Sequence, residues 1–389
     1  METDLSGEFG ASGDTTTTVV FAAVVLARFV LPLFILKYPL PAILACLVLD
    51  GVDQSIFQWF GHDPPGYQSY DKAMDVFYLA VAYLSMLRNW TSRPAFAVGW
   101  FLFFYRLVGV VAFEATHVRL LLLVFPNTFE YYFIAYEVIR TRWSVVSRAQ
   151  KFWTVLAAGI WIVVKLPQEY WIHVAGMDLT DTLSDHPWTW GVLLALIAGS
   201  LAGVTWLVRT HLGPPGPRWH VSAAPIPPQI DTGATRAYWI AKYAAIRSWG
   251  TVEKVVLVGL MAVIYGSVLP GYSGDPVDLF VGVGTVVLAN AVFTLVMARK
   301  VWTVETATAA IIVRLGFNIV FVHVADFVLN GGRDDLNSID TLFFLSLISL
   351  VTTLHDRYRP VHSTRLREAE ETPAAHDGET AVPGAPAAR

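Results

Sequence analysis

Long apolar runs, separated by short polar or Pro/Gly-rich breaks, dominate the hydropathy pattern of the chain from residue 16 to residue 355. A helix needs roughly 20 mostly apolar residues to cross about 30 Å of hydrocarbon, and runs of this length recur along the sequence. The pattern therefore predicts an all-α, polytopic transmembrane bundle of about 11 spanning helices. The predicted spans cover residues 16–36, 39–59, 70–87, 94–113, 118–139, 152–173, 188–208, 252–270, 277–298, 304–325 and 340–355.

Basic residues fall at alternate boundaries between these spans, as the positive-inside rule requires of cytoplasmic loops. The opposite loops are acidic or neutral, as in residues 62–71, with Arg333 as a lone exception. We therefore expect the N-terminus outside and the C-terminus in the cytoplasm. The basic residues on the predicted cytoplasmic side include Lys37, Arg88, Arg93, Arg140, Arg142, Arg148, Lys151, Arg209, Arg218, Arg299, Lys300, Arg357 and Arg359.

The breaks also predict how the chain is organised. Residues 1–15 are expected to be a disordered N-terminus, and residues 16–209 a transmembrane bundle of about seven helices. Residues 210–250 form a Pro/Gly-rich cytoplasmic connector, in which aromatic and basic residues at helical spacing from Arg236 to Trp249 suit a helix on the inner membrane surface. A second bundle of about four helices covers residues 251–355, and residues 356–389 are expected to be a disordered cytoplasmic tail.

Composition narrows the class of protein. Of 389 residues, 55% are hydrophobic and 15% are charged, whereas soluble chains have about 45–50% apolar and about 25% charged residues. A secreted disulfide scaffold, a disordered chain and an ordinary cytosolic enzyme are thereby excluded, and the single cysteine, Cys46, excludes a disulfide framework and a cysteine-based zinc site. A net charge of −4 gives no reason to expect a nucleic-acid partner. The expected partner is the bilayer of the cell (plasma) membrane, and the oligomeric state stays open.

Ionisable residues within the predicted spans are the main functional signal. Each costs at least ~2.5 to 3.5 kcal/mol at bilayer depth, so such residues usually face a bundle interior and have a partner or a function. Most of them map between the membrane midplane and the outer face, which predicts a connected polar cavity open to the outside. They include the acids Asp50, Asp53, Asp71, Asp75, Glu114, Glu130 and Glu169 and the bases Arg106, Arg119, Lys165 and Arg314.

Four aspartates are candidate metal ligands. Asp50 and Asp53 lie three residues apart in the second span, and Asp71 and Asp75 lie four apart at the start of the third. Divalent cations such as Mg²⁺ bind clustered carboxylate oxygens and commonly hold phosphate-bearing substrates, so a divalent cation is the cofactor that this set suggests. The alternative for Asp71 is a solvated residue at a helix start, favoured by the helix dipole.

The spacing of these aspartates resembles the motif of the CDP-alcohol phosphatidyltransferases, which bind metal through four aspartates on two neighbouring helices. That family also has a glycine where Gln54 stands, an Ala-Arg pair where Phe57 and Gln58 stand, and a glycine where Tyr67 stands. Its site opens to the cytoplasm, whereas these aspartates map to the outer side. We therefore do not assign the chain to it.

Two further groups of polar residues accompany proline. Glu130 follows Pro126 in the fifth span, where proline removes a backbone hydrogen bond and can kink the helix. In the sixth span, a stripe of Lys165, Glu169 and His173 is interrupted by Pro167. We predict catalytic roles for Asp50, Asp53, Glu130, Lys165 and Glu169, and substrate-binding roles for Arg106, Arg314, Asn318 and His173. The structural alternatives are an intrahelical salt pair between Lys165 and Glu169 and charge neutralisation by the arginines.

Three functions fit this sequence. The first is a membrane-embedded enzyme that acts on a lipid or lipid-linked phosphate from an outward-open polar cavity. The second is a proton- or cation-coupled transporter that uses Glu130 and the Lys165/Glu169 pair as its coupling site. The third is a noncatalytic subunit of a membrane complex, in which the polar residues specify helix packing. No P-loop, GxSxG, HExxH or dinucleotide fingerprint is present.

Overall fold

The regular secondary structure of the computed structural model is all helical, and the described residues contain no strand. The described residues are 15–60, 67–145, 148–170, 186–212, 215, 219–243, 246–268, 274–300, 304, 306–330 and 338–378. The predicted disorder of residues 1–14 falls outside these residues, as does the position of His173.

The first half of the chain forms a series of upright helices. Their bounds are α1 (Thr15–Val30), η2 (Leu31–Leu36), α2 (Pro39–Trp59), α3 (Tyr67–Asn89), α4 (Arg93–Thr116), α5 (Leu120–Val124), α6 (Thr128–Arg142), α7 (Gln150–Gly159), η3 (Ile160–Lys165), α8 (Leu166–Glu169), α10 (Thr189–Leu207) and η5 (Val208–Leu212).

The second half follows a connector that contains two short helical elements. The two elements of the connector are η6 (Pro228–Ile230) and α11 (Gly233–Tyr243). The helices that follow are α12 (Trp249–Val268), α13 (Pro276–Arg299), α14 (Ala307–Asn330) and α15 (Ser338–Gly378).

Five of the described helices are long and apolar enough to cross a membrane. These segments indicate an integral membrane protein, because about 20 apolar residues match the thickness of the hydrocarbon core. They are Val19–Leu36, Arg93–Thr116, Trp249–Val268, Pro276–Arg299 and Ala307–Val328.

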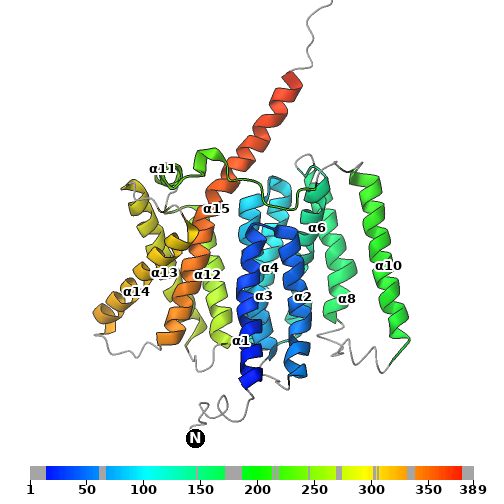
Figure 1. Ribbon diagram of the computed structural model, residues 1–389, viewed down its shortest axis with the longest axis horizontal. Coiled ribbons are helices and arrows are strands. Elements are labelled where there is room, and N and C mark those ends of the chain that lie inside the picture. The colour runs from blue at the N-terminus through cyan, green and yellow to red at the C-terminus, as the bar shows by residue number, and fades with distance from the viewer. Residues whose placement is uncertain are drawn as a thin grey trace, which may run out of the picture.

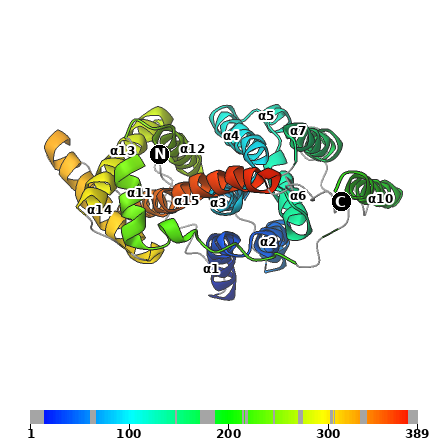
Figure 2. The same cartoon turned by 90° about the horizontal axis from the view of Figure 1, so that it is seen from above.

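The helices form two groups that meet at α3, α12 and α15 (Figures 1 and 2). Helix α15 packs against α3, α12 and α14, while α12 also packs against α4 and α13. A hydrogen-bonded chain crosses this junction: the Tyr83 hydroxyl donates to Glu253 over 2.6 Å, and Glu253 is 2.8 Å from the ring of His355. Helix α10 lies at the margin of the bundle in both views.

The helical path breaks at Pro126, as the sequence predicted. Helix α5 ends at Val124 and α6 begins at Thr128, which leaves backbone groups without helical partners. Two charged side chains provide hydrogen-bond partners for these backbone groups. Arg106 donates to the carbonyl of Phe125 over 3.0 Å, and Glu169 accepts from the backbone N–H of Asn127 over 3.4 Å. The break therefore uses two of the intramembrane charges that the sequence singled out.

Helix α15 continues beyond the predicted end of the last span. A disordered tail was expected from residue 356, but the helix runs to Gly378. Polar residues in the part of the helix just beyond residue 356 have partners elsewhere in the fold. Arg365 donates to the carbonyls of Ala224 and Pro225 in the connector over 3.1 and 2.8 Å. The ring of His362 packs 4.0 Å from that of Phe96, and burial lowers the pKa of this imidazole to about 3, so it is neutral at pH 7.

Candidate functional site

Arg28 lies at the centre of the four aspartates that were predicted to be metal ligands. It is contributed by α1, and its guanidinium forms ion pairs with Asp50 and Asp53 of α2. The same group lies 3.0 Å from Asp71 and 3.1 Å from Asp75, both on α3. One arginine therefore contacts all four carboxylates, and two neighbouring helices, α2 and α3, converge on it.

Helical periodicity explains why the four carboxylates meet. Residues three or four apart lie on one face of a helix, so Asp50 and Asp53 share a face of α2, and Asp71 and Asp75 share a face of α3. Helices α1, α2 and α3 pack against one another, which brings both faces onto α1. The cluster lies in the half of the bundle where α1 begins and α2 ends (Figure 1).

Burial divides this aspartate cluster into two parts. The side chains of Arg28 and Asp53 are 3% and 0% exposed, whereas those of Asp50, Asp71 and Asp75 are 23%, 29% and 15% exposed. The three partly exposed carboxylates are also close enough to share a metal ion, since one oxygen of each lies within 4.8 Å of the others. The accessible side of the cluster is thus its most acidic side.

The charges of the aspartate cluster do not balance. Arg28 and Lys72 carry two positive charges against four carboxylates, with Lys72 close enough to interact electrostatically with Asp71 and Asp75. Lys72 is buried, and its ammonium lies 5.0 Å from the ring centre of Phe113. When all four carboxylates are ionised, the excess negative charge favours a cation at this position.

A second polar group surrounds the break between α5 and α6. Glu130 is 3% exposed, accepts from the hydroxyl of Tyr78 over 2.8 Å and accepts from the side-chain amide of Asn127 over 3.0 Å. Lys165 lies 3.9 Å from Glu169 and 4.4 Å from the ring centre of Tyr131. The intrahelical pair that the sequence suggested is thus present.

Tyr78 connects the two polar groups. It follows Asp75 by three residues on α3, so both side chains lie on one helical face. Asp75 also interacts electrostatically with Glu130 and Lys165. The predicted catalytic residues Asp50, Asp53, Glu130, Lys165 and Glu169 therefore belong to one region of the fold.

The predicted substrate-binding residues lie in different parts of the fold. Arg106 lies beside Glu130 and contacts the carbonyl of Phe125. Arg314 and Asn318 instead lie on α14, where Arg314 forms an ion pair with Asp356 over 2.8 Å and Asn318 contacts Asn290 and Ser349. They belong to the second group of helices rather than to the aspartate cluster.

Sequence reasoning overlooked Arg28, Lys72 and Tyr78. Arg28 was detectable as a single cation in the apolar run Val19–Leu36, and Lys72 as a cation between two predicted metal ligands. Tyr78 gave no signal of its own, because its partner Glu130 is 52 residues away in the sequence.

The comparisons with known proteins give no family for this arrangement. No family model matches the chain, and neither the curated proteins nor the solved structures contain a match.

Proposed function

We propose that the protein is a membrane-embedded enzyme that acts on a lipid or lipid-linked phosphate at the aspartate cluster. The main observation behind this proposal is that Asp50, Asp71 and Asp75 present carboxylate oxygens within 4.8 Å of one another on the partly exposed side of the cluster. This donor set fits a hard divalent cation, which prefers oxygen ligands. A cation held by these residues supplies Lewis-acid activation of a phosphoryl oxygen.

The chain's own residues have distinct roles in this proposal. Arg28 holds the four carboxylates together, and the fully buried Asp53 fixes Arg28 from the closed side. Glu130 and the Lys165/Glu169 pair lie beside the cluster and provide groups that bind or transfer protons next to a substrate. Arg106, hydrogen-bonded to the backbone break, keeps this second group in position.

A topology of about 11 crossings in the plasma membrane accompanies this proposal. Support comes from the helices beyond the five most apolar ones: α2, α3 and α10 have 21, 23 and 19 residues. Helices α2 and α3 run beside α1, and α10 stands at the margin of the bundle in Figure 1. The first residues of α1 and the last residues of α15 lie at opposite ends of the bundle, as an odd number of crossings requires. With the basic loops in the cytoplasm, the aspartate cluster faces outward.

The direct test uses purified full-length protein in nanodiscs made from the lipid extract of the source cells. Lipids are compared by mass spectrometry after incubation with Mg²⁺, with Mn²⁺ or with a chelator. We expect a metal-dependent conversion of one phosphate-bearing lipid that Asp75→Asn abolishes. The matched control is Asp278→Asn, which removes an exposed carboxylate from the start of α13. Unchanged lipids under all conditions contradict the proposal.

Proton- or cation-coupled transport is the second candidate, and a specific observation favours it. Glu130, Tyr78 and Asn127 form a buried hydrogen-bonded group at a broken helix, which is typical of ion sites in transporters. Proton uptake into proteoliposomes separates the two functions. Uptake that Glu130→Gln abolishes, together with unchanged lipids, assigns the site to transport.

A further inference from the structure

A second polar site lies at the opposite end of the bundle from the aspartate cluster. Helix α11 covers the end of α13 and packs against α15 on the side where α15 projects (Figures 1 and 2). Below α11, an open pocket is bounded by α11, α13, α14 and α15. We call it the α11 pocket.

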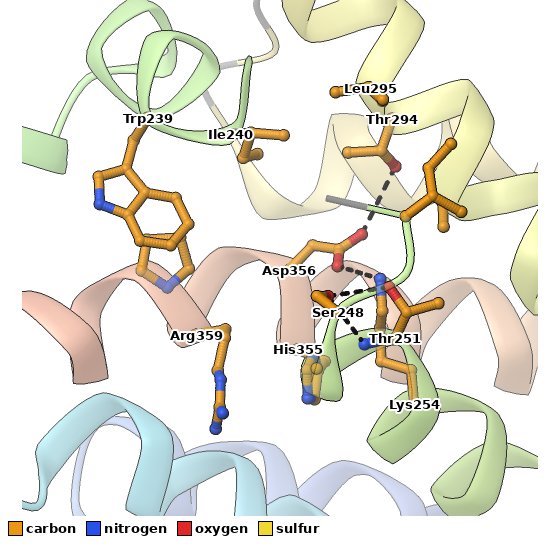
Figure 3. A pocket seen from close by; sticks show the side chains of 14 residues that line it. Trp239, Ile240, Ser248, Thr251, Lys254, Thr294, Leu295, His355, Asp356 and Arg359 are labelled. Carbon is orange, nitrogen blue, oxygen red and sulfur yellow. Dashed lines mark hydrogen bonds and ion pairs between the residues drawn. The ribbon is translucent and has the colours of Figure 1, made fainter. Parts of the chain in front are cut away.

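Asp356 anchors the polar wall of the α11 pocket. Its carboxylate pairs with Arg314 over 2.8 Å and with Lys254 over 2.6 Å, while Arg314 also donates to Thr294 over 2.6 Å. Figure 3 shows the neighbouring pocket on the other side of this carboxylate, where Thr294 and Lys254 converge on Asp356 beneath Trp239. Asp356 is thus engaged by two cations from different helices.

Two residues that line the α11 pocket each have a buried donor atom with no acceptor within the part of the chain that the structure describes. These atoms are Nη1 of Arg314, in a residue that is 7% exposed, and Oγ1 of Thr353, in a residue that is 4% exposed. A guanidinium N–H can only donate, and a hydroxyl can donate. Since buried polar groups are rarely left unsatisfied, both atoms indicate an acceptor-rich ligand in this pocket.

The charge of the α11 pocket indicates the sign of that ligand. Arg236, Arg314 and Arg357 line it, and Asp356 is its only acidic lining residue among those described. Because Lys254 also pairs with Asp356, the region has an excess of positive charge. Arginine is the side chain best suited to bind phosphate oxygens, since its planar group presents several donors.

The remaining walls of the α11 pocket are apolar. They include Phe293, Met297, Val304 and Val313. On the outside of α11, Tyr238 is 65% exposed and Tyr243 is 48% exposed, and the ammonium of Lys242 lies within 5.6 Å of both ring centres. Exposed tyrosines and a lysine on an amphipathic helix are typical of the membrane interface, which is the depth of lipid headgroups.

We propose that the α11 pocket binds the phosphate group of an anionic amphiphile, with Arg314 and Thr353 as the buried donors and Arg236 at the entrance. The apolar walls on α13 and α14 then contact the hydrophobic part of the ligand. This site is separate from the aspartate cluster and does not depend on the activity proposed for it. The same phosphate chemistry is offered by a lipid headgroup and by free phosphate, so the test includes both.

The test measures binding to the full-length protein in dodecyl maltoside. The probes are dihexanoyl phosphatidylglycerol, the zwitterionic dihexanoyl phosphatidylcholine and inorganic phosphate, and the readouts are the shift in thermal unfolding and ligand retention in native mass spectrometry. The variants are Arg314→Gln, Thr353→Val and Arg236→Gln. The matched controls are Arg299→Gln and Thr285→Val, which change exposed residues of α13 that do not line the pocket.

We expect phosphatidylglycerol to bind more tightly than phosphatidylcholine, and each pocket variant to weaken its binding about tenfold, equivalent to about 1.4 kcal/mol. Binding of inorganic phosphate with the same dependence on the variants assigns the pocket to free phosphate and keeps the proposal. If Arg314→Gln does not fold, Thr353→Val and Arg236→Gln decide. Equal binding of the two lipids, or native affinity in folded Thr353→Val and Arg236→Gln, overturns the proposal.

Discussion

Arg28 and Asp53 form an ion pair between α1 and α2 that is almost completely closed to solvent, with side chains 3% and 0% exposed. A buried pair of this kind contributes little net stability when complete, but it is costly to break because one charge is left without compensation. Here the same arginine also contacts three other carboxylates. The first prediction tests this dependence.

Replacement of Arg28 by glutamine should lower the free energy of unfolding by about 3 to 5 kcal/mol, because it leaves the buried carboxylate of Asp53 without its partner. The double variant Arg28→Gln/Asp53→Asn should recover part of this loss. Denaturant titration in detergent measures both effects, with Arg119→Gln as the exposed control. A loss in Arg28→Gln no larger than that in the control contradicts the assigned pairing.

Divalent cations should stabilise the protein through the aspartate cluster. A ligand that binds only the folded state adds about 2.7 kcal/mol at a concentration of 100 times its Kd. We expect Mg²⁺ or Mn²⁺ to raise the thermal midpoint of chelator-treated protein, and Asp50→Asn or Asp75→Asn to abolish the increase. An equal increase in these variants and in Asp278→Asn would place the bound cation elsewhere.

Close packing of α4 against the helix break should make Gly109 intolerant of a side chain. A Cβ atom at this position meets Cβ of Phe125, in the segment between α5 and α6. Overpacking of this kind typically costs about 1 to 3 kcal/mol, so Gly109→Ala should destabilise the protein by that amount.

Gly282 provides the matched control for that substitution. It lies on an exposed face of α13, and a Cβ there has no neighbour within 4 Å. Gly282→Ala should leave stability unchanged or raise it by up to about 1 kcal/mol, because alanine favours the helix. Thermal unfolding of the two variants side by side gives the comparison, and equal stability of both would show that the segment at Phe125 can shift to accommodate the added methyl group.

The hydroxyl of Tyr83 should contribute to stability separately from its buried ring. It donates to the buried carboxylate of Glu253, and hydrogen bonds to charged groups contribute about 1.5 to 3 kcal/mol. Tyr83→Phe removes only the hydroxyl, so we expect a loss of this size in the free energy of unfolding. Tyr238→Phe, at an exposed position on α11, should have no effect. Identical unfolding curves for both variants would exclude a structural role for this bond.

Hydropathy and helical spacing accounted for the local features of this fold. The runs around α12, α13 and α14 predicted those helices to within a few residues, and Pro126 predicted the break before α6. The i, i+3 and i, i+4 spacings predicted which aspartates share a helical face. These are properties of a single helix, so they can be read from the sequence alone.

Pairings between distant helices could not be predicted in the same way. Arg314 was grouped with the aspartates because all are charged and intramembrane, yet its partner is Asp356, 42 residues further along. The length of α15 was also hidden, because its stability beyond residue 356 depends on carbonyl groups of the connector that Arg365 binds. The partner of Arg314 and the length of α15 therefore depend on tertiary packing and not on local composition.

Helix α15 has 41 residues, and at 1.5 Å per residue it measures about 60 Å, roughly twice the thickness of the hydrocarbon core. It carries His355 and Asp356 on the same continuous rod that projects from the bundle in Figure 1. Because the helix is continuous, a tilt or rotation of its projecting end would also move Asp356, which pairs with Lys254 of α12 and Arg314 of α14. The projecting end of α15 is therefore mechanically connected to the contacts that hold α12 and α14.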